Sequence, residues 1–244
     1  SSDSQFDELE EQLRAIDPTN KYFSIVGVNI KGSNQIRHNH PLLSCAKGKE
    51  PSDAIDWLKR ISYNGLLIGM AKVDGLTGCI TYTDGKFSHM STRGDGEIGQ
   101  DISHLASYLA IPQEIPYGGV IDIVGEIYLP KDTKLETNGK PLRNIASGLV
   151  NRKDKTDDWK YLHFVSYNLL GNNTVYTFED RLSRLEMFGF EVVQFRHLKK
   201  DQIEPFYRDY EARLRDSWNY ETDGIVLQVD SLGELERIDL LYVV

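Results

Sequence analysis

The sequence predicts an α+β fold with antiparallel sheets and flanking helices. Short runs rich in β-branched and aromatic residues follow one another closely between residues 66 and 92, and Asp84-Gly85 lies between two of them. An Asp-Gly pair between two such runs is a strong hairpin signal. Segments with helical spacing lie before and after these runs and do not alternate with each strand. This order of elements favours α+β over a parallel α/β sheet.

Helices are expected where apolar residues recur at intervals of three and four. Ser52 is expected to cap the second of them, and Gly189 to end the third. The predicted helices cover four segments: 3–16, 52–63, 177–188 and 203–215.

Strands are expected in short apolar or alternating runs bounded by turn residues. These runs are 66–73, 78–84, 86–92, 118–129, 161–170 and 224–229. There is no internal repeat, and the plausible domain boundary lies near residues 17–35, between the first helix and the body.

Composition indicates an ordinary globular chain. Of its 244 residues, 40% are hydrophobic and 27% charged, with a net charge of −9. No run reaches the roughly 18 apolar residues of a membrane span. Cys45 and Cys79 are most simply free thiols in a reducing cytoplasm. Dedicated nucleic-acid binders are usually basic, so any contact with DNA must come from local basic clusters or from a neighbouring domain.

The most informative segment is Lys72-Val73-Asp74-Gly75, at the end of an apolar strand. Strand alternation places Lys72 and Asp74 on one face, at the rim of a sheet. A lysine amine is a nucleophile only when it is neutral, and desolvation or nearby positive charge favours that form. On this motif alone, a surface turn with a salt bridge is the commoner explanation.

Two acidic positions further along the chain change that balance. Glu126 lies in a strand after Gly125 and is suited to a ribose hydroxyl or a metal ion, and Asp223-Gly224 precedes an apolar strand. Taken alone, Glu126 would most simply be a solvent-facing glutamate, and Asp223-Gly224 would be a tight turn into a core strand. The order Lys-x-Asp-Gly, Gly-Glu, Asp-Gly-Ile-Val is far less expected by chance.

Taken together, these motifs resemble those of the NAD-dependent DNA ligases, a family of lysine nucleotidyltransferases related to ATP-dependent ligases and mRNA capping enzymes. The most specific stretch is 91–102, STRGDGEIGQDI, which resembles the family's TRGDGxxGEDVT. Four further stretches agree in family order: 36–44 (IRHNHPLLS), 141–148 (PLRNIASG, similar to the NPRNAAAG loop), 163–167 (HFVSY) and 3–7 (DSQFD, similar to DAEYD).

The resemblance implies a lysine-nucleotidyltransferase fold over 21–244 and part of a small helical domain over 1–20 that binds nicotinamide mononucleotide. Lys72 would attack the α-phosphorus of NAD and become lysyl-AMP, for transfer to the 5′-phosphate of nicked double-stranded DNA. Asp74 and Asp223 would orient the lysine, and Asp74 and Glu126 would hold Mg²⁺.

The resemblance also implies binding roles for other residues. Those that would contact the adenylate half of NAD are Ser44, Cys45, Arg93, Glu126, Tyr167, Val226 and Gln228, with Tyr167 stacked on adenine. Those that would contact the nicotinamide mononucleotide half are Asp3, Phe6 and Asp7. Those that would contact DNA are Arg143, Arg152 and Arg215.

The chain departs from the family pattern at several places. Met70 replaces a usual glutamate, Gln228 replaces a nucleotide-contacting lysine, and a terminal W-x-x-x-[YF]-K run is missing. Loss of a charge-assisted hydrogen bond costs about 1.5–3 kcal/mol. No oligonucleotide-binding fold follows, so we expect self-adenylation, and we expect nick sealing to need such a domain or a partner subunit.

Three alternatives stay open. The chain could be a nucleotide-binding module of the same fold that has lost transfer activity, which Gln228 and the missing terminal lysine favour. It could be an ATP-dependent relative, such as an RNA ligase or a capping enzyme, which the stretches at 91–102 and 3–7 oppose. A scaffold without chemistry is the third alternative.

Overall fold

The structure is a computed structural model that describes residues 34–43, 45–171, 174–235 and 242–243. The predicted helix at 3–16, the proposed domain at 1–20 and most of the predicted boundary at 17–35 therefore lie outside the described residues. The same is true of four candidate site residues: Asp3, Phe6, Asp7 and Ser44.

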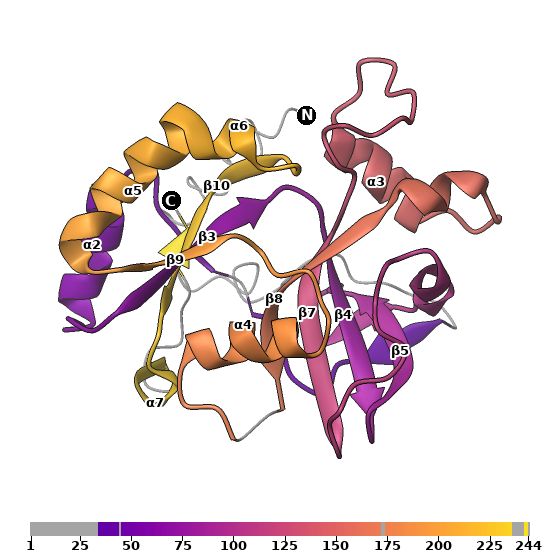
Figure 1. Ribbon diagram of the computed structural model, residues 1–244, viewed down its shortest axis with the longest axis horizontal. Coiled ribbons are helices and arrows are strands. Elements are labelled where there is room, and N and C mark those ends of the chain that lie inside the picture. The colour runs from indigo at the N-terminus through magenta and orange to yellow at the C-terminus, as the bar shows by residue number, and fades with distance from the viewer. Residues whose placement is uncertain (1–33, 44, 172–173, 236–241, 244) are drawn as a thin grey trace, which may run out of the picture.

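One of the two larger sheets has five strands, in the order β2-β11-β10-β3-β9 (Figure 1). Its strands are β2 (Ala46–Lys47), β11 (Tyr242–Val243), β10 (Thr222–Val229), β3 (Leu67–Val73) and β9 (Phe195–Leu198). The central pair, β10 and β3, is antiparallel, and Gln228 lies opposite Ile68. The predicted strands at 66–73 and 224–229 are confirmed, whereas β9 was not predicted.

The other large sheet has four antiparallel strands in the order β5-β4-β7-β8. They are β5 (Lys86–Thr92), β4 (Leu76–Thr83), β7 (Val120–Tyr128) and β8 (His163–Leu170). Asp84 and Gly85 both have positive φ, 48° and 79°, as the predicted hairpin turn requires. A separate two-stranded ribbon pairs β1 (Gln35–Arg37) with β6 (Ile98–Gln100).

Helices α2 (Pro51–Arg60) and α5 (Ile203–Asp209) cover the outer face of the five-stranded sheet (Figure 1). Their buried side chains pack against the outward-facing residues of the central strands in one cluster: Trp57, Leu58, Ile203 and Phe206 with Leu67, Ile225, Leu227 and Val229. Side chains at alternate positions of β10 thus face the helices, and the others face the inner side of the molecule.

The predicted helix boundaries are confirmed in part. α2 begins at Pro51 after the N-cap Glu50, so the prediction of a cap at Ser52 was wrong; the Asp53 carboxylate accepts hydrogen bonds from the backbone NH groups of Lys49 and Glu50. α4 (Phe178–Met187) has a capping box between Thr177 and Asp180. Gly189 follows it with φ 90°, as expected at a helix end.

Two segments differ from the prediction. The stretch 141–148 is not a loop, because helix α3 (Leu142–Val150) begins directly after Pro141. The predicted helix 203–215 is also interrupted: α5 passes into the π-helical turn η5 (Tyr210–Leu214) and then α6 (Arg215–Ser217). The remaining short helices are η2 (Ser103–Ser107), η3 (Asp157–Tyr161), η4 (Lys200–Gln202) and α7 (Leu232–Leu235).

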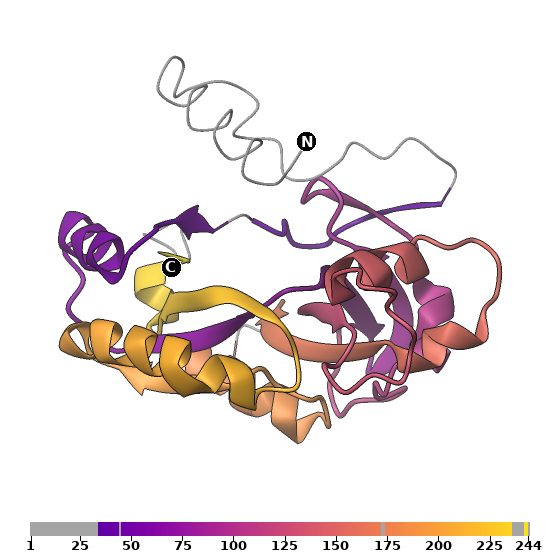
Figure 2. The ribbon, with the colours of Figure 1, turned by 90° about the horizontal axis from the view of Figure 1, so that it is seen from above.

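The two large sheets meet at Asp74-Gly75, because β3 belongs to the five-stranded sheet and β4 to the four-stranded one. Figure 2 shows β3 running from the part that contains α2 and α5 toward the four-stranded sheet. The main core lies between these layers and includes Met70 from β3, Ile80 from β4 and Ile123 from β7. The polar motif residues therefore lie where the apolar core reaches the surface.

Candidate functional site

Lys72, near the end of β3, is paired with Asp223 at the start of β10. Its Nζ donates hydrogen bonds to Asp223 Oδ1 and Oδ2 at 2.6 and 2.5 Å, and the two side chains are 33% and 41% exposed. The strands are register-matched there, with Thr222 opposite Val73 and a bulge before Ile225. Gly224, within the bulge, has φ 152°. The bulge adds one residue on the β10 side of the ladder next to Asp223.

Asp74 has a different partner from Lys72. Its Oδ1 accepts a hydrogen bond from Arg143 Nη1 at 3.1 Å, which ties the turn to helix α3. Gly75 is a steric requirement at this turn, since a Cβ atom there would lie 2.4 Å from the carbonyl oxygen of Ile127 and 2.8 Å from Glu126 Cγ. The glycine of the motif thus lets the turn approach the strand that carries Glu126.

Glu126 lies in β7, beside the turn, with its carboxylate below the surface. Burial raises its pKa from 4.5 to about 8, and the positive charges of Arg93, Lys72 and Arg143 oppose that rise. Thr77 Oγ1 donates a weak hydrogen bond to Glu126 Oε2 at 3.4 Å. A carboxyl with this pKa is largely protonated at neutral pH, so it can donate a hydrogen bond as well as accept one.

Tyr167 and Cys45 line the same site. Burial, with the Glu126 carboxylate next in importance, raises the pKa of the Tyr167 hydroxyl well above its usual value, and a hydrogen bond with Thr77 opposes this. Burial raises the pKa of the Cys45 thiol to about 11, against the attraction of Lys72 and Arg93. Both side chains are therefore neutral. Cys45 and Cys79 are free thiols, as predicted.

Arg93 is the first residue of the tight loop 93–97, which joins β5 to β6 and lies within the family-like stretch. Its backbone NH donates to Thr77 O at 3.2 Å, and its carbonyl oxygen accepts from Gly96 N at 3.0 Å. Asp95 Oδ1 accepts from the backbone NH groups of Glu97 and Ile98, which lowers the Asp95 pKa. A Cβ at Gly94 would lie 1.8 Å from Ile98 O, so side chains are excluded there. These hydrogen bonds and the close approach at Gly94 fix the backbone conformation of the loop.

Val226 and Gln228 lie on the inner face of β10. Val226 is opposite Met70 and packs against the main core. Gln228 is fully buried, and its Nε2 donates to Val229 O at 3.1 Å, whereas its Oε1 has no hydrogen-bond partner among the described residues. An unpaired buried amide oxygen is costly, which is compatible with a ligand or water partner.

The three predicted DNA-contacting arginines are all exposed, but they lie on different elements. Arg143 is in α3, Arg152 follows its end, and Arg215 follows the π-helical turn. The carbonyl oxygen of Arg215 accepts a hydrogen bond from Lys131 Nζ at 2.6 Å. π-helical turns are rare and occur often at functional sites, and Arg215 directly follows this one.

The carboxylates fit a magnesium ion only if a ligand completes its coordination. Within the described parts of the chain, no three His, Cys, Asp or Glu side chains gather as a metal cluster. Mg²⁺ in proteins commonly takes one or two carboxylates together with water and substrate phosphates. Glu126 and Asp74 therefore remain candidates for an ion that binds together with a nucleotide.

The structure thus places Cys45, Lys72, Arg93, Glu126 and Tyr167, from five separate segments, close enough for their charges to act on one another. Thr77 was not predicted, although it contacts both Glu126 and Tyr167. It lies in β4 directly opposite Glu126, and this pairing follows from strand register, which the sequence alone does not show. A surface hollow lined by Ile55, Leu66 and Lys199–Asp201 contains none of the candidate residues.

Comparison with known proteins assigns the chain to a family. Residues 31–240 match the family model described as the NAD-dependent DNA ligase adenylation domain. The chain belongs to that family. No helix in the described part of the chain has the length and apolar character needed to cross a bilayer.

Curated relatives named DNA ligase match most of the chain. The protein from Petrotoga mobilis is 29% identical over 266 residues, which cover 97% of this chain and 40% of the relative. Those from Oceanobacillus iheyensis and Clostridioides difficile are each 31% identical and cover 87% and 95% of this chain. The chain spans about two fifths or less of the length of these relatives.

Solved structures support the fold. An archaeal ATP-dependent RNA ligase aligns with a TM-score of 0.52 at 13% identity, over 84% of this chain and 48% of that one. A putative ATP-dependent DNA ligase from Aquifex aeolicus aligns with a TM-score of 0.50 at 11% identity, over 83% and 49%. The predicted α+β fold with antiparallel sheets is confirmed.

Proposed function

We propose that Lys72 is the residue that accepts AMP from NAD. The observation that carries this proposal is the Lys72–Asp223 contact beside Glu126, Arg93 and Tyr167. The amine's electron pair forms the bond to the α-phosphorus as the bond to the departing nicotinamide mononucleotide breaks. The amine proton passes to the Asp223 carboxylate, which already accepts its hydrogen bond.

The neighbouring side chains are suited to hold the adenylate. Arg93 supplies positive charge for the phosphate, and the neutral ring of Tyr167 offers a face for the base. Glu126 and Thr77 can bind sugar hydroxyls, since one carboxyl with a raised pKa can both donate and accept. Mg²⁺, held by Glu126 or Asp74, would neutralise phosphate charge as a Lewis acid.

Intact-mass measurement tests this function. The protein is incubated with Mg²⁺ and either NAD or ATP, and a gain of one adenylyl group with NAD is expected. Lys72→Ala abolishes the gain, whereas Lys59→Ala, at an exposed lysine paired with Asp56, leaves it unchanged. An adduct from ATP would contradict the choice of NAD, and an adduct that survives Lys72→Ala would contradict the choice of lysine.

A second candidate is a module of the same fold that binds NAD without transferring AMP. It is favoured by Gln228, where the family pattern has a lysine, and by Met70, where it has a glutamate. Both residues lie on the inner face of the central strands, so each change removes one charged group from the same region. Equilibrium binding of NAD with no mass gain would identify this second candidate.

We also propose nicked duplex DNA as the partner of the whole protein, with Arg143, Arg152 and Arg215 as contacts. Each arginine that neutralises a phosphate steepens the salt dependence of binding. Arg143→Ala is expected to weaken binding to a nicked duplex and to reduce the slope of log K against log salt by about 1. Arg60→Ala, at the end of α2, is the control. Equal slopes for both variants would remove Arg143 from the interface.

We propose that residues 1–20 form part of a domain that contacts nicotinamide mononucleotide through Asp3, Phe6 and Asp7, with 21–244 as the nucleotidyltransferase domain. Nick sealing is proposed for the whole protein, with an oligonucleotide-binding-fold domain or a partner subunit, in the cytoplasm. Asp7→Ala should lower the affinity for NAD without lowering the affinity for AMP, and titration with each ligand would measure both affinities.

A further inference from the structure

Asp122, in β7, is a buried carboxylate that lies outside the site described above. Its side chain is 1% exposed, and among the described residues three side chains form hydrogen bonds with its oxygens. Thr81 Oγ1 and Asn39 Nδ2 donate to Oδ1 at 2.7 and 3.0 Å, and His40 Nδ1 lies 2.8 Å from Oδ2. A buried carboxylate requires such partners. One comes from the neighbouring strand, and two come from a distant segment.

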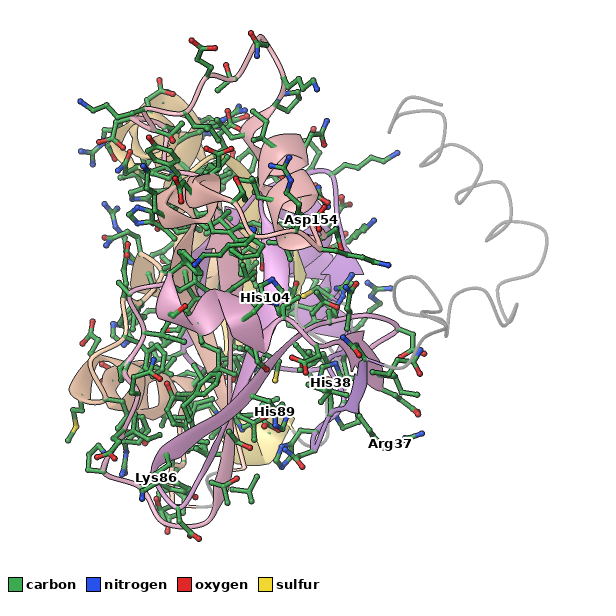
Figure 3. The ribbon with its side chains drawn as sticks, turned by 90° about the vertical axis from the view of Figure 1, so that its right-hand side faces the viewer. Arg37, His38, Lys86, His89, His104 and Asp154 are labelled. Atoms are coloured by element: carbon green, nitrogen blue, oxygen red, sulfur yellow. The ribbon has the colours of Figure 1, made fainter. Side chains whose placement is uncertain are left out.

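That segment is the 35–43 strap, which runs along the four-stranded sheet before Cys45. Beyond the β1–β6 pairing, it is tied to the loop that carries Arg93. His38 Nε2 lies 3.0 Å from Arg93 O, and His38 N and Leu42 N donate to Glu97 O and Gly96 O. Arg37 and His38 of the strap are labelled in Figure 3, which views this side of the molecule.

Leu42 connects the strap to the nucleotide side of the sheet. It is buried in a small cluster with Cys79 and Val124, and Tyr167 and Leu170 pack against that cluster. Cys79 and Val124 are register partners in β4 and β7, so the cluster lies on the same sheet as Glu126. The position of the Tyr167 ring therefore depends on where the strap holds Leu42.

The Asp122 side chain is not needed to hold its own strand. The backbone of β7 is paired on both sides at this level, with Thr81 in β4 and Leu170 in β8. Among the described residues, the other hydrogen bonds of this carboxylate go to Asn39 and His40 of the strap. The imidazole of His40 also fits closely, since a Cβ at Gly171 would lie 2.9 Å from its Cε1.

We propose that Asp122 is a positioning residue for the nucleotide site: through Asn39 and His40 it holds the strap so that Leu42 supports Tyr167. The inference rests on the proposed function, because it takes Tyr167 as the base-stacking residue. Disturbing the strap should loosen one wall of the site and leave Lys72 and Asp223 in place. The expected effect is therefore on nucleotide affinity and not on the maximal rate of adenylation.

The test compares two hydrogen bonds to the same carboxylate. His40→Phe removes the strap's nitrogen and keeps a ring over Gly171, and His40 is 39% exposed, so the variant should fold. Thr81→Val removes the bond that stays within the sheet. His40→Phe should raise the KM for NAD in self-adenylation roughly tenfold with kcat nearly unchanged. Thr81→Val should leave KM within about twofold even if it lowers the melting temperature.

A double variant gives a second readout. Leu42→Ala should raise KM by itself, and adding His40→Phe should raise it little further, because both act through one contact. Additive effects, equal KM changes in His40→Phe and Thr81→Val, or an unchanged KM in His40→Phe would each overturn the proposal.

The role of the strap can be tested even if the proposed adenylation by Lys72 fails. If the wild-type protein forms no adduct, the catalytic proposal for Lys72 fails, and the same variants are compared by equilibrium binding of NAD. Weaker binding in His40→Phe than in Thr81→Val then supports the role of the strap. Equal binding, or no binding of NAD by the wild-type protein, overturns it.

Discussion

Lys72 Nζ contacts both carboxylate oxygens of Asp223, at 2.6 and 2.5 Å, although 151 residues separate the two in sequence. The contact forms because β3 and β10 are adjacent antiparallel strands whose ends meet at this edge. The Asp223 carboxylate is therefore within hydrogen-bond distance of Lys72 Nζ and is placed to accept a proton from it. In the proposed reaction, that transfer accompanies attack by the neutral amine.

Asp223→Asn should slow self-adenylation by about two to three orders of magnitude, because the amide keeps the shape of the side chain but cannot take up the proton. Single-turnover mass spectrometry at saturating NAD measures the rate. Asp56→Asn is the matched control, since Asp56 also accepts a hydrogen bond from a lysine, at 2.7 Å, but on the surface of α2. A loss of less than about threefold in Asp223→Asn would exclude the proton-acceptor role.

Glu126 should make the stability of the protein depend on pH. Its folded-state pKa of about 8 lies above the value of 4.5 for an unperturbed carboxyl. Protonation thus favours the folded state: this contribution is complete below pH 4.5 and is lost as the pH rises through 8. Glu126→Gln stays neutral, so its melting temperature should rise relative to wild type between about pH 5.5 and about pH 8.5.

Thermal unfolding across this range measures the difference. Glu97→Gln, at an exposed carboxylate paired with Arg37, is the control and should run nearly parallel to wild type. A Glu126→Gln curve that also stays parallel to wild type would show that Glu126 is not destabilised by burial.

Gly75→Ala should disturb the site through the backbone. The added Cβ would lie 2.4 Å from Ile127 O, so the turn or β7 must move, at a cost of roughly 1–3 kcal/mol. Since Glu126 Cγ is the next nearest atom, adenylation should fall as well. Chemical denaturation and the mass assay measure the two effects.

Gly148→Ala provides the comparison, because a Cβ there would meet no atom within 4 Å in helix α3. It should be neutral or stabilise the protein by up to about 1 kcal/mol. If Gly75→Ala were equally harmless, the close approach between the turn and β7 would not be a constraint in solution.

Gln228→Met should show opposite effects on stability and binding. The variant replaces a buried amide, whose Oε1 has no described partner, with an apolar side chain of similar shape. Removing an unpaired buried acceptor should raise the free energy of unfolding by about 1 kcal/mol. If Oε1 bonds the bound nucleotide, affinity for NAD should fall at the same time. Unchanged affinity would place Gln228 outside the nucleotide site.

The strands and the hairpin could be predicted because their signals are local. Alternating apolar residues indicate which face of a strand is buried, and an Asp-Gly pair indicates a hairpin turn. Neither signal depends on distant parts of the chain. Helix α3 was missed because its stretch begins with proline and contains Asn144 and Gly148, which are typical of loops. Its stability comes from burying Ala146, Leu149 and Val150 against the core, which composition does not show.

The site divides in the same way. The family-like stretches and the individual candidates Lys72, Arg93, Glu126 and Asp223 could be recognised from the sequence, because each lies in a local pattern. Which side chains meet became evident from the folded chain: Asp223 with Lys72, Arg143 with Asp74, and His40 with Asp122 across 82 residues. Strand register and burial set these pairings, and both depend on how distant segments pack, which no local pattern records.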